Sequence, residues 1–472
     1  MIGLLGTLNM AAQSLQTQMT GVQVTGQNLA NVGTTGYARQ TVDIQSTPDI
    51  ATSIGPEGSG ADATSIQQVV SSFLNSQVQS QQSVSGYWSS QQTALQTAQT
   101  NLDEFLSGTA GANGSSTDTS STGLSAQMSG LFTSFSSLAA SPTSASAQQA
   151  VVSQAQNLAS TFNQVDSSLS SLKDSLNSSL TTDVGSANEL LSNIASLNGE
   201  INSAEFSGGT ANELLDTREQ DLENLSKLTD IQTTTGTGSA VNVTIGGQTL
   251  VSGSQVLDSL QTYDAGSGQM LVQTATSGTA LTLTGGSIQG TIDARDGTLA
   301  TLQSGVNKLA STLITQVNAA QDAGYSATGT SGTTFFTGTD ASDIGVNSTL
   351  AGNPSLIQTS GTATAGGDNS VALQLANLAS ASQTTLGNQT FSDSYDQTVA
   401  GLGDALQTAN DQVSNQTAVT TMLQTQQNDL SGVNVDEEMT NLMGFQRAYE
   451  ASAQLVTTLN TMMGDTLTMK TA

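Results

Sequence analysis

The side chains that could carry out chemistry are few in this chain of 472 residues, because it contains no cysteine and no histidine. Serine and cysteine nucleophile triads and imidazole or thiolate metal sites are therefore excluded. Carboxylates remain, and the densest run is Asp436, Glu437 and Glu438. Adjacent residues on a helix do not face one another, so we interpret this run as a helix start capped by Asn434. The sequence predicts a protein that is not an enzyme and needs no cofactor or metal.

A second pattern, Asp-x-Arg followed by an acidic residue, occurs twice. One copy holds Asp216 and Arg218, and the other holds Asp293 and Arg295. Only eight residues of the chain are lysine or arginine, so two arginines in equivalent contexts are informative. One interpretation is a pair of helix starts whose guanidinium groups bind carboxylates or carbonyls across a domain joint. The alternative, two solvated first turns, fits the sequence equally well.

The charge balance limits the possible partners. Eight basic and 37 acidic residues give a formal net charge of −29. Nucleic acid and anionic membrane surfaces are therefore disfavoured, because both need clustered basic side chains. No apolar run approaches the roughly 18 residues of a membrane span, so we expect no membrane insertion. The first residues lack the basic region of a signal peptide, so export would proceed without a cleaved Sec signal.

The elements that could position these residues are clearest at the two ends, where apolar residues recur every seven positions. Such a repeat places one apolar stripe along a helix, which then needs a partner helix. Neither end has a partner nearby in the sequence, so we expect the ends to pack on each other or on other copies of the chain. The predicted assembly residues are Leu4, Leu8, Leu15, Val22 and Leu29 near the N-terminus, and Val435, Met439, Leu442, Tyr449, Val456, Leu459 and Met463 near the C-terminus.

The segments between the ends predict a mainly α fold with a β insertion. Alternating apolar residues and a Gly246-Gly247 hairpin signal interrupt long stretches of helical periodicity. We expect an elongated multi-domain protein with terminal coiled-coil helices, a long helical bundle and a small β module at one tip. The expected domains are a terminal coiled-coil domain (1–40 with 431–472), a helical bundle domain (41–230 with 291–330 and 371–430) and an outer β domain (231–290, possibly with 331–370).

The stretch from residue 28 to residue 40 is the most distinctive local motif. Asn28 and Asn31 lie about one turn apart at an expected helix end, where their amides can bond to neighbouring backbone. Gly36 permits a tight turn, and Tyr37 can anchor the strand that follows. Arg39 is the first charged residue of the chain. Taken alone, this motif is a helix C-terminal cap.

The same stretch resembles the N-terminal signature of the axial proteins of the bacterial flagellum, which are the rod, hook and hook-associated proteins. That signature is close to Asn-Leu-Ala-Asn-Val-Asn-Thr-Pro-Gly-Tyr-Ser-Arg-Gln, and this chain differs from it only at Gly33, Thr35 and Ala38. The C-terminal run 431–453 is most similar to hook-associated members. Internal stretches that agree with them are 214–222, 285–296, Val317-Asn318 and Phe335-Phe336.

The resemblance implies a structural subunit of the flagellum, located at the hook–filament junction, that self-assembles as a ring or helix through its terminal helices. It also implies export through the flagellar type III apparatus, an extracellular location and an inner coiled-coil domain. The implied partners are other copies of the chain, the hook protein, the second hook–filament junction protein and an export chaperone at the C-terminal helix.

Two alternatives remain open from the sequence. Another axial protein, such as the second junction protein, hook protein or flagellin, would share the terminal heptads but not the Asp-x-Arg stretches. A secreted adhesin or surface-layer protein would share the polar, cysteine-free composition, but it would not need matched heptads at both ends.

Overall fold

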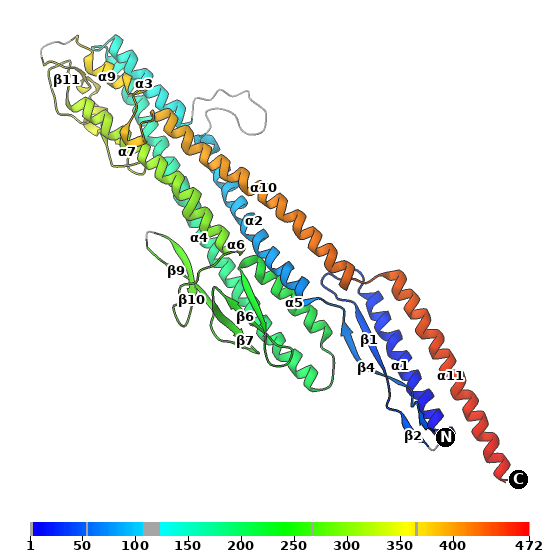
Figure 1. Cartoon of the computed structure of the whole chain (residues 1–472). Helices are drawn as coiled ribbons and strands as arrows, with labels where there is room; N and C mark the ends of the chain where they lie inside the picture. Colours follow the sequence, from blue (N-terminus) through cyan, green and yellow to red (C-terminus); the bar gives the residue numbers. More distant parts are fainter. Residues whose placement is uncertain (1–2, 53–54, 107–122, 267, 364–366, 472) are drawn as a thin grey trace.

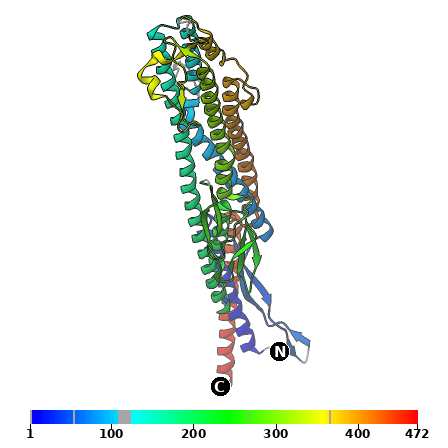
Figure 2. The same ribbon diagram turned by 90° about the vertical axis from the view of Figure 1, so that its left-hand side faces the viewer.

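The chain folds into a long rod with both termini at one end (Figure 1). The computed structural model describes residues 3–52, 55–106, 123–266, 268–363 and 367–471. A second view shows the same elongated shape (Figure 2). The long helices are α1 (Leu4–Ala30), α2 (Ser72–Leu106), α3 (Leu124–Ala140), α4 (Ala145–Phe206), α5 (Asn212–Leu228), α7 (Ala300–Asp322), α10 (Phe391–Ser431) and α11 (Val435–Thr471). The shorter ones are α6 (Gly286–Asp293), α8 (Ser348–Gly352), α9 (Ser370–Asn377), the π-helix η1 (Ala294–Leu299) and the 3-10 helices η2 (Pro354–Leu356) and η3 (Thr384–Leu386).

The helical bundle is built around α4, which is 62 residues long. Its buried side chains recur mostly at three- and four-residue steps, which places them along one side of the helix. They meet apolar residues of α2, α3, α7 and α10 in one continuous core. We call the end of the rod away from the two termini the distal end. Near it, the ring centroids of Phe135 and Phe335 lie 5.6 Å apart. The predicted mainly α fold with a β insertion is confirmed.

Residues 325–360 complete the distal end of the bundle. They form two short antiparallel ladders, β11 (Tyr325–Ser326) with β14 (Gln358–Ser360) and β12 (Phe336–Thr337) with β13 (Gly345–Val346). Phe335 and Phe336 are buried in the bundle core. The amide of Asn318 on α7 accepts from the N–H of Phe336 at 2.8 Å and donates to its carbonyl at 2.9 Å. Grouping 331–370 with the β module, which the sequence left open, is therefore wrong.

The β module contains a four-stranded antiparallel sheet in the order β5-β6-β7-β8 and a separate hairpin of β9 and β10. Gly246 and Gly247 both have positive φ, at 54° and 80°, and form the predicted turn. The strands are β5 (Ile231–Thr235), β6 (Val241–Ile245), β7 (Gln248–Ser252), β8 (Gln255–Val256), β9 (Leu260–Asp264) and β10 (Met270–Thr274).

This module lies along the flank of α4 and α5 rather than at a tip of the molecule, so its expected position was wrong (Figure 1). Two asparagines of α4 hold it there. The side chain of Asn188 donates to the carbonyl of Leu260 and accepts from its N–H, both at 2.8 Å. Asn198 accepts from the N–H of Val241 at 3.1 Å and donates to its carbonyl at 2.8 Å. These pairings fix the module at a place along α4 that periodicity cannot reveal.

A β-hairpin near the N-terminus packs against α1. It consists of β1 (Gln40–Ser46) and β4 (Ala61–Gln68), with β2 (Ile50–Thr52) and β3 (Gly55–Glu57) between them. The hydroxyl of Thr17 on α1 donates to the carbonyl of Ala61 at 3.3 Å. We therefore group the hairpin with α1 and α11, and call these three elements the terminal unit. The boundary expected after residue 40 is wrong, because the hairpin packs mainly on α1 and only the end of β4 meets the bundle, at α5.

Candidate assembly site

The two terminal helices lie side by side and run antiparallel (Figure 1). The hydroxyls of Ser14 and Ser452 lie 3.0 Å apart. Seven residues further along α1, Gly21 lies against the ring of Phe445. After seven more, the amide of Asn28 donates to the Glu438 carboxylate at 3.0 Å. Contacts at seven-residue steps, with one chain direction reversed, define an antiparallel two-helix seam.

The predicted apolar stripe enters this seam only in part. On α11 the seam follows a line that is rotated by about 60° from the predicted one. The observed line contains Glu438, Phe445, Ser452 and Leu459. The five predicted residues of α1, Leu4, Leu8, Leu15, Val22 and Leu29, are half-buried, as are Leu442, Val456 and Met463 of α11, whereas Leu459 is buried. Val435, Met439 and Tyr449 remain 45%, 42% and 40% exposed.

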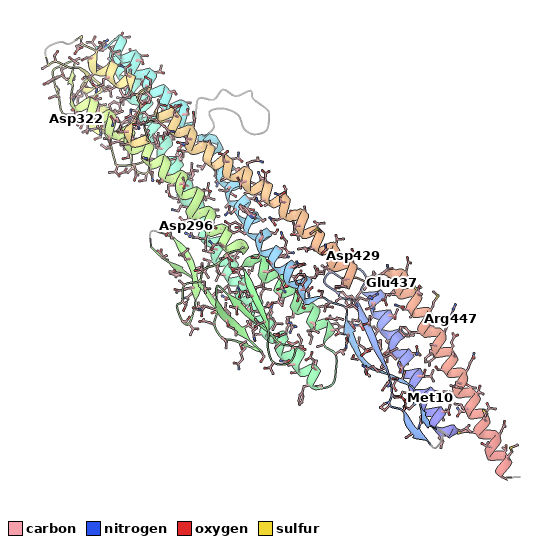
Figure 3. All side chains as sticks on the ribbon, in the orientation of Figure 1. Met10, Asp296, Asp322, Asp429, Glu437 and Arg447 are labelled. Carbon is pink, nitrogen blue, oxygen red and sulfur yellow. The ribbon has the colours of Figure 1, made fainter. Side chains whose placement is uncertain are left out.

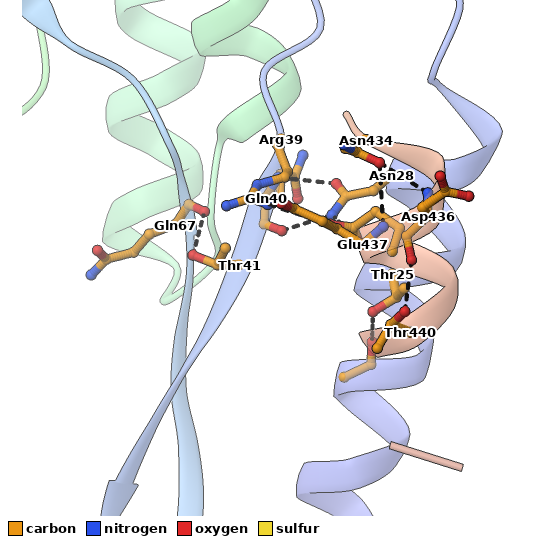
Figure 4. A network of polar contacts seen from close by, with 12 residues as sticks. Thr25, Asn28, Arg39, Gln40, Thr41, Gln67, Asn434, Asp436, Glu437 and Thr440 are labelled. Atoms are coloured by element: carbon orange, nitrogen blue, oxygen red, sulfur yellow. Dashed lines mark hydrogen bonds and ion pairs between the residues drawn. The ribbon is translucent and has the colours of Figure 1, made fainter. Parts of the chain in front are cut away.

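Asn28 is the centre of a buried polar network at the end of α1 (Figure 4). Its amide nitrogen donates to the Gln40 carbonyl at 2.8 Å and to Glu438 at 3.0 Å. Its amide oxygen accepts from the Tyr37 hydroxyl at 2.8 Å and from the Gln40 N–H at 3.0 Å. An asparagine amide has two donors and two acceptor positions, so all four are used. Burial is the largest cause that raises the pKa of Tyr37 to about 12, which keeps it a donor.

Arg39 ties the same turn to the start of α11. Its guanidinium lies 2.9 Å from the Glu437 carboxylate and 3.9 Å from that of Glu438. Its backbone N–H donates to the Ser431 carbonyl at 2.7 Å, at the break between α10 and α11. Asn434 caps α11 as predicted, since its side chain accepts from the backbone N–H groups of residues 436 and 437.

The other motif residues act locally. Asn31 donates to the carbonyl of Gln27 at 3.0 Å and accepts from the hydroxyl of Thr34 at 3.1 Å. Gly36 has φ of +81°, which a residue with a Cβ adopts only under strain. These two residues shape the turn that delivers Tyr37 and Arg39 to the network.

Gln40 and Ser431 lie within the motifs that the sequence indicated, but the sequence predicted no role for them and no partner for Glu438. Gln40 and Ser431 contribute through backbone groups, which carry no sequence signal. Glu438 was interpreted as part of a helix cap, and its partner Asn28 lies 410 residues away in the chain. No local pattern can find such a pair.

Asp216, from the first Asp-x-Arg copy, joins the terminal unit to the bundle. Its carboxylate accepts from the Ala38 N–H at 3.3 Å and from the Gln68 side chain at 2.7 Å. Gln68 also donates to the Asn212 carbonyl at 2.7 Å, and Asn212 donates to the carbonyl of Ile66. Burial raises the pKa of Asp216 to about 6.

Comparison with known proteins matches two parts of the chain to models of flagellar proteins. The model described as "Flagellar hook-associated protein FlgK helical domain" matches residues 114–336. The model described as "Flagellar basal body rod FlgEFG protein C-terminal" matches residues 426–469, which include most of α11. Flagellar hook-associated protein 1 of Bacillus subtilis is 27% identical over 95% of both chains. The chain resembles flagellar hook-associated protein 1 along almost its whole length.

Two further relatives extend the comparison. Flagellar hook-associated protein 1 of Escherichia coli K12 is 24% identical, over 96% of this chain and 97% of its own. The solved structure of the flagellar hook junction protein FlgK from Burkholderia pseudomallei has a TM-score of 0.63 at 19% identity. It covers 75% of this chain and 100% of its own, and at that identity it shows a shared fold. This similarity does not favour the adhesin or surface-layer alternative.

Both Asp-x-Arg copies lie in the part that matches the family's helical domain. The side chain of Arg218 on α5 is buried, and it donates to Asn198 of α4 at 2.9 Å and to the Ser239 carbonyl at 2.6 Å. It therefore links two bundle helices to the β module. This copy lies near the start of α5, and its arginine binds a carbonyl group. The alternative interpretation of this copy, a solvated first turn, is wrong because Arg218 is buried.

The second copy lies inside a continuous helical run of α6, η1 and α7. Arg295 is fully buried and makes two bonds of 2.7 Å to the carboxylate of Asp296 and one of 2.7 Å to Asn177 of α4. Asp293 accepts from the Tyr87 hydroxyl at 2.8 Å. For this second copy, the predicted helix start is wrong, and so is the alternative of a solvated first turn. The copies do not meet, because Asn177 and Asn198 lie 21 residues apart on one helix, about 30 Å.

Two features that other functional classes need are absent from the ranges that the structure describes. Those ranges hold no group of three or more acidic side chains arranged for a metal ion. Among their helices, none is long and apolar enough to cross a membrane. The candidate site is therefore the seam of α1 and α11 with the Asn28 network at its end.

Proposed function

We propose that this chain is a structural subunit of the bacterial flagellum that forms the junction between hook and filament by self-assembly through its terminal helices. The observation that carries the proposal is the antiparallel seam of α1 and α11, which leaves apolar side chains of both helices exposed. Soluble monomers rarely expose continuous apolar surface unless it meets a partner. The predicted assembly residues keep their role as part of this proposal.

The exposed side of α11 carries a ridge with four-residue spacing. Val435, Met439 and Met443 are 45%, 42% and 48% exposed. Rows with this spacing pack into grooves of another helix. Arg447 continues the row and projects from the outer side of α11 (Figure 3). The ridge is therefore available to a helix of a neighbouring copy.

The exposed side of α1 differs from this ridge. Leu5 and Met19 are 67% and 52% exposed, and a Cβ at Gly26 would meet no atom within 4 Å. No charged residue lies on α1, so covering it requires no desolvation of charge. Because the two exposed faces are different, contact between them joins copies head to tail. Contacts of this kind build rings or helices.

The distribution of charge favours contact through the terminal helices. Residues 1–40 and 431–472 hold three basic and five acidic residues, a net charge of −2 out of −29. The remaining −27 belongs to the intervening residues 41–430. Copies with such bodies repel one another, so their close contact is most favourable where charge is almost absent.

The proposal extends to partners and location. The subunit would meet the hook protein on one side and the second junction protein on the other, outside the cell after type III export. Before assembly, an export chaperone would cover the apolar ridge of α11. Three observations support this part: the exposed methionines of α11, the similarity of the chain to hook-associated protein 1 of Bacillus subtilis and the match of residues 426–469 to the flagellar rod-protein model.

Complementation of a strain that lacks this protein tests the proposal. The null strain should form hooks without filaments and release flagellin into the medium. Met443→Glu places a charge on the ridge, and we expect a folded protein that does not restore filaments. Gln454→Glu, at an exposed polar position of the same helix, should restore them. Full restoration by Met443→Glu, or by a chain that lacks residues 435–472, would contradict the proposal.

A further inference from the structure

One side of α5 carries four carboxylates, and each accepts a hydrogen bond from a glutamine of a different element. The carboxylates are three or four residues apart, which places them on one face of the helix. The pairs are Gln27 of α1 with Glu213 (2.5 Å), Gln68 of β4 with Asp216 (2.7 Å), Gln79 of α2 with Glu219 (2.8 Å) and Gln427 of α10 with Glu223 (3.4 Å). We call this row the carboxylate ladder. It joins the terminal unit and two bundle helices to α5.

No cation neutralises the ladder within the described part of the chain, apart from weak effects of α5's own basic residues. Arg218 is directed to Asn198 and the Ser239 carbonyl. Lys227, in the last turn of α5, lies 3.2 Å from Asn224. It makes a small contribution that lowers the pKa of Glu223.

The elements that face the ladder add negative charge or none. α1 has no charged residue, α10 has five acidic residues and no basic one, and α2 has acidic residues only near its far end. Asp62 is the only charged residue of β4. At the turn and in the first residues of α11, the charged groups are Arg39, which is paired with Glu437, the exposed Asp436 and the buried Glu438. Tyr37 is a further titratable group there. Further acidic groups are Glu205 of α4, which acts on Arg218, and Asp221 of α5.

We propose that the carboxylate ladder is a pH-responsive seam, which holds the terminal unit firmly against the bundle in mild acid and loosely at neutral and alkaline pH. Neighbouring carboxylates at three- and four-residue spacing repel one another when ionised, and partial burial strengthens that repulsion. Protonation of the carboxylates removes this repulsion. Glutamine can accept as well as donate, so each partner can still bind a protonated carboxyl group.

The electrostatic environment supports this direction. Burial is the largest cause that raises the pKa of Asp216 to about 6, and it also raises the pKa values of Glu219 and Glu223. A carboxyl whose pKa is raised in the packed state stabilises that state fully below its ordinary pKa of about 4. The stabilisation is lost as the pH rises through the raised value. The seam therefore tightens as the pH falls from 8 toward 5.

Electron paramagnetic resonance distances between two spin labels test this in the full-length monomer. The chain has no cysteine, so Gln232→Cys on the β module and Gln454→Cys on α11 are labelled uniquely. Both positions are exposed. We expect the distance distribution to narrow as the pH falls from 8 to 5, with a midpoint near 6. Equal widths at both pH values, or broadening in acid, would overturn the proposal.

A set of amide variants separates the ladder from the other acidic residues. Asp216→Asn, Glu219→Gln and Glu223→Gln together imitate the protonated ladder, so the narrow distribution should persist from pH 5 to pH 8. The single Glu219→Gln variant, a smaller change, should narrow the distribution at pH 8 in part. Asp322→Asn, at the exposed distal end of α7, should leave the pH response intact (Figure 3). A full response in the triple variant would overturn the proposal. Assembly plays no part in the measurement, so it stands apart from the proposed function.

Discussion

Phe445 of α11 lies so close to Gly21 of α1 that a Cβ at residue 21 would come within 2.5–2.8 Å of three ring carbons. Contacts of this kind are tighter than any ordinary van der Waals contact. The missing side chain at residue 21 therefore sets the spacing of the two terminal helices. A Cβ at Gly26, five residues later on the same helix, would meet no atom within 4 Å. Gly26 is therefore a matched control for substitutions at Gly21.

Alanine at these two glycines should have opposite effects on stability. Gly26→Ala should raise the free energy of unfolding by about 0.5–1 kcal/mol, because glycine inside a helix is destabilising. Gly21→Ala should lower it by about 1–2 kcal/mol, because the methyl group must displace the Phe445 ring. Urea unfolding followed by circular dichroism measures both. Stabilisation by Gly21→Ala would show that Phe445 does not rest on this glycine.

Replacing Asn28 should weaken the terminal unit. Asn28→Ala leaves the Tyr37 hydroxyl, both backbone groups of Gln40 and the Glu438 carboxylate without their partner, which should cost about 2–3 kcal/mol. Asn31→Ala removes only local bonds and serves as the control, with a cost of about 0.5–1 kcal/mol. Hydrogen exchange of peptides from residues 37–46 should accelerate in the first variant and change little in the second. Equal effects of the two variants would contradict a central role for Asn28.

The buried guanidinium of Arg295 should matter more than the exposed one of Arg447. Arg295→Met leaves Asp296 and Asn177 without their partner inside the bundle, and we expect a loss of about 2–4 kcal/mol. Arg447→Met should change stability by about 0.5 kcal/mol or less. Thermal unfolding of the two purified variants provides the comparison. Similar melting temperatures would mean that the Arg295 contacts contribute little.

Stability should depend on pH through Asp216. Its pKa is raised to about 6 by burial, so the protonated form favours the folded joint. The wild-type protein should therefore gain stability relative to Asp216→Asn as the pH falls from 7.5 to 5, and most of the change should occur near pH 6. Melting temperatures of both proteins across this pH range test the sign of this stability difference. A gap that widens in favour of the variant as the pH falls would show the opposite linkage.

The sequence was sufficient to predict the elements but not their exact neighbours. Seven-residue spacing predicted two helices without local partners, and the turn from Asn28 to Arg39 indicated the family. The predicted line of contact on α11 is offset from the observed one. The observed seam uses Glu438 and Ser452, which are polar residues that an apolar pattern omits. The position of the β module depends on Asn188 and Asn198, whose hydrogen bonds are to backbone groups far away in the chain. Pairings of this kind leave no periodic signal.

The exposed ridge of α11 is central to this account, and photo-crosslinking in intact flagella tests it most directly. A photoreactive amino acid at residue 443 should give covalent dimers of the chain after irradiation of purified hook–filament complexes. The same group at residue 322, on the distal end of α7, should give far fewer (Figure 3). Dimers from residue 443 are the predicted result, and monomer alone at that position would contradict assembly through the terminal helices.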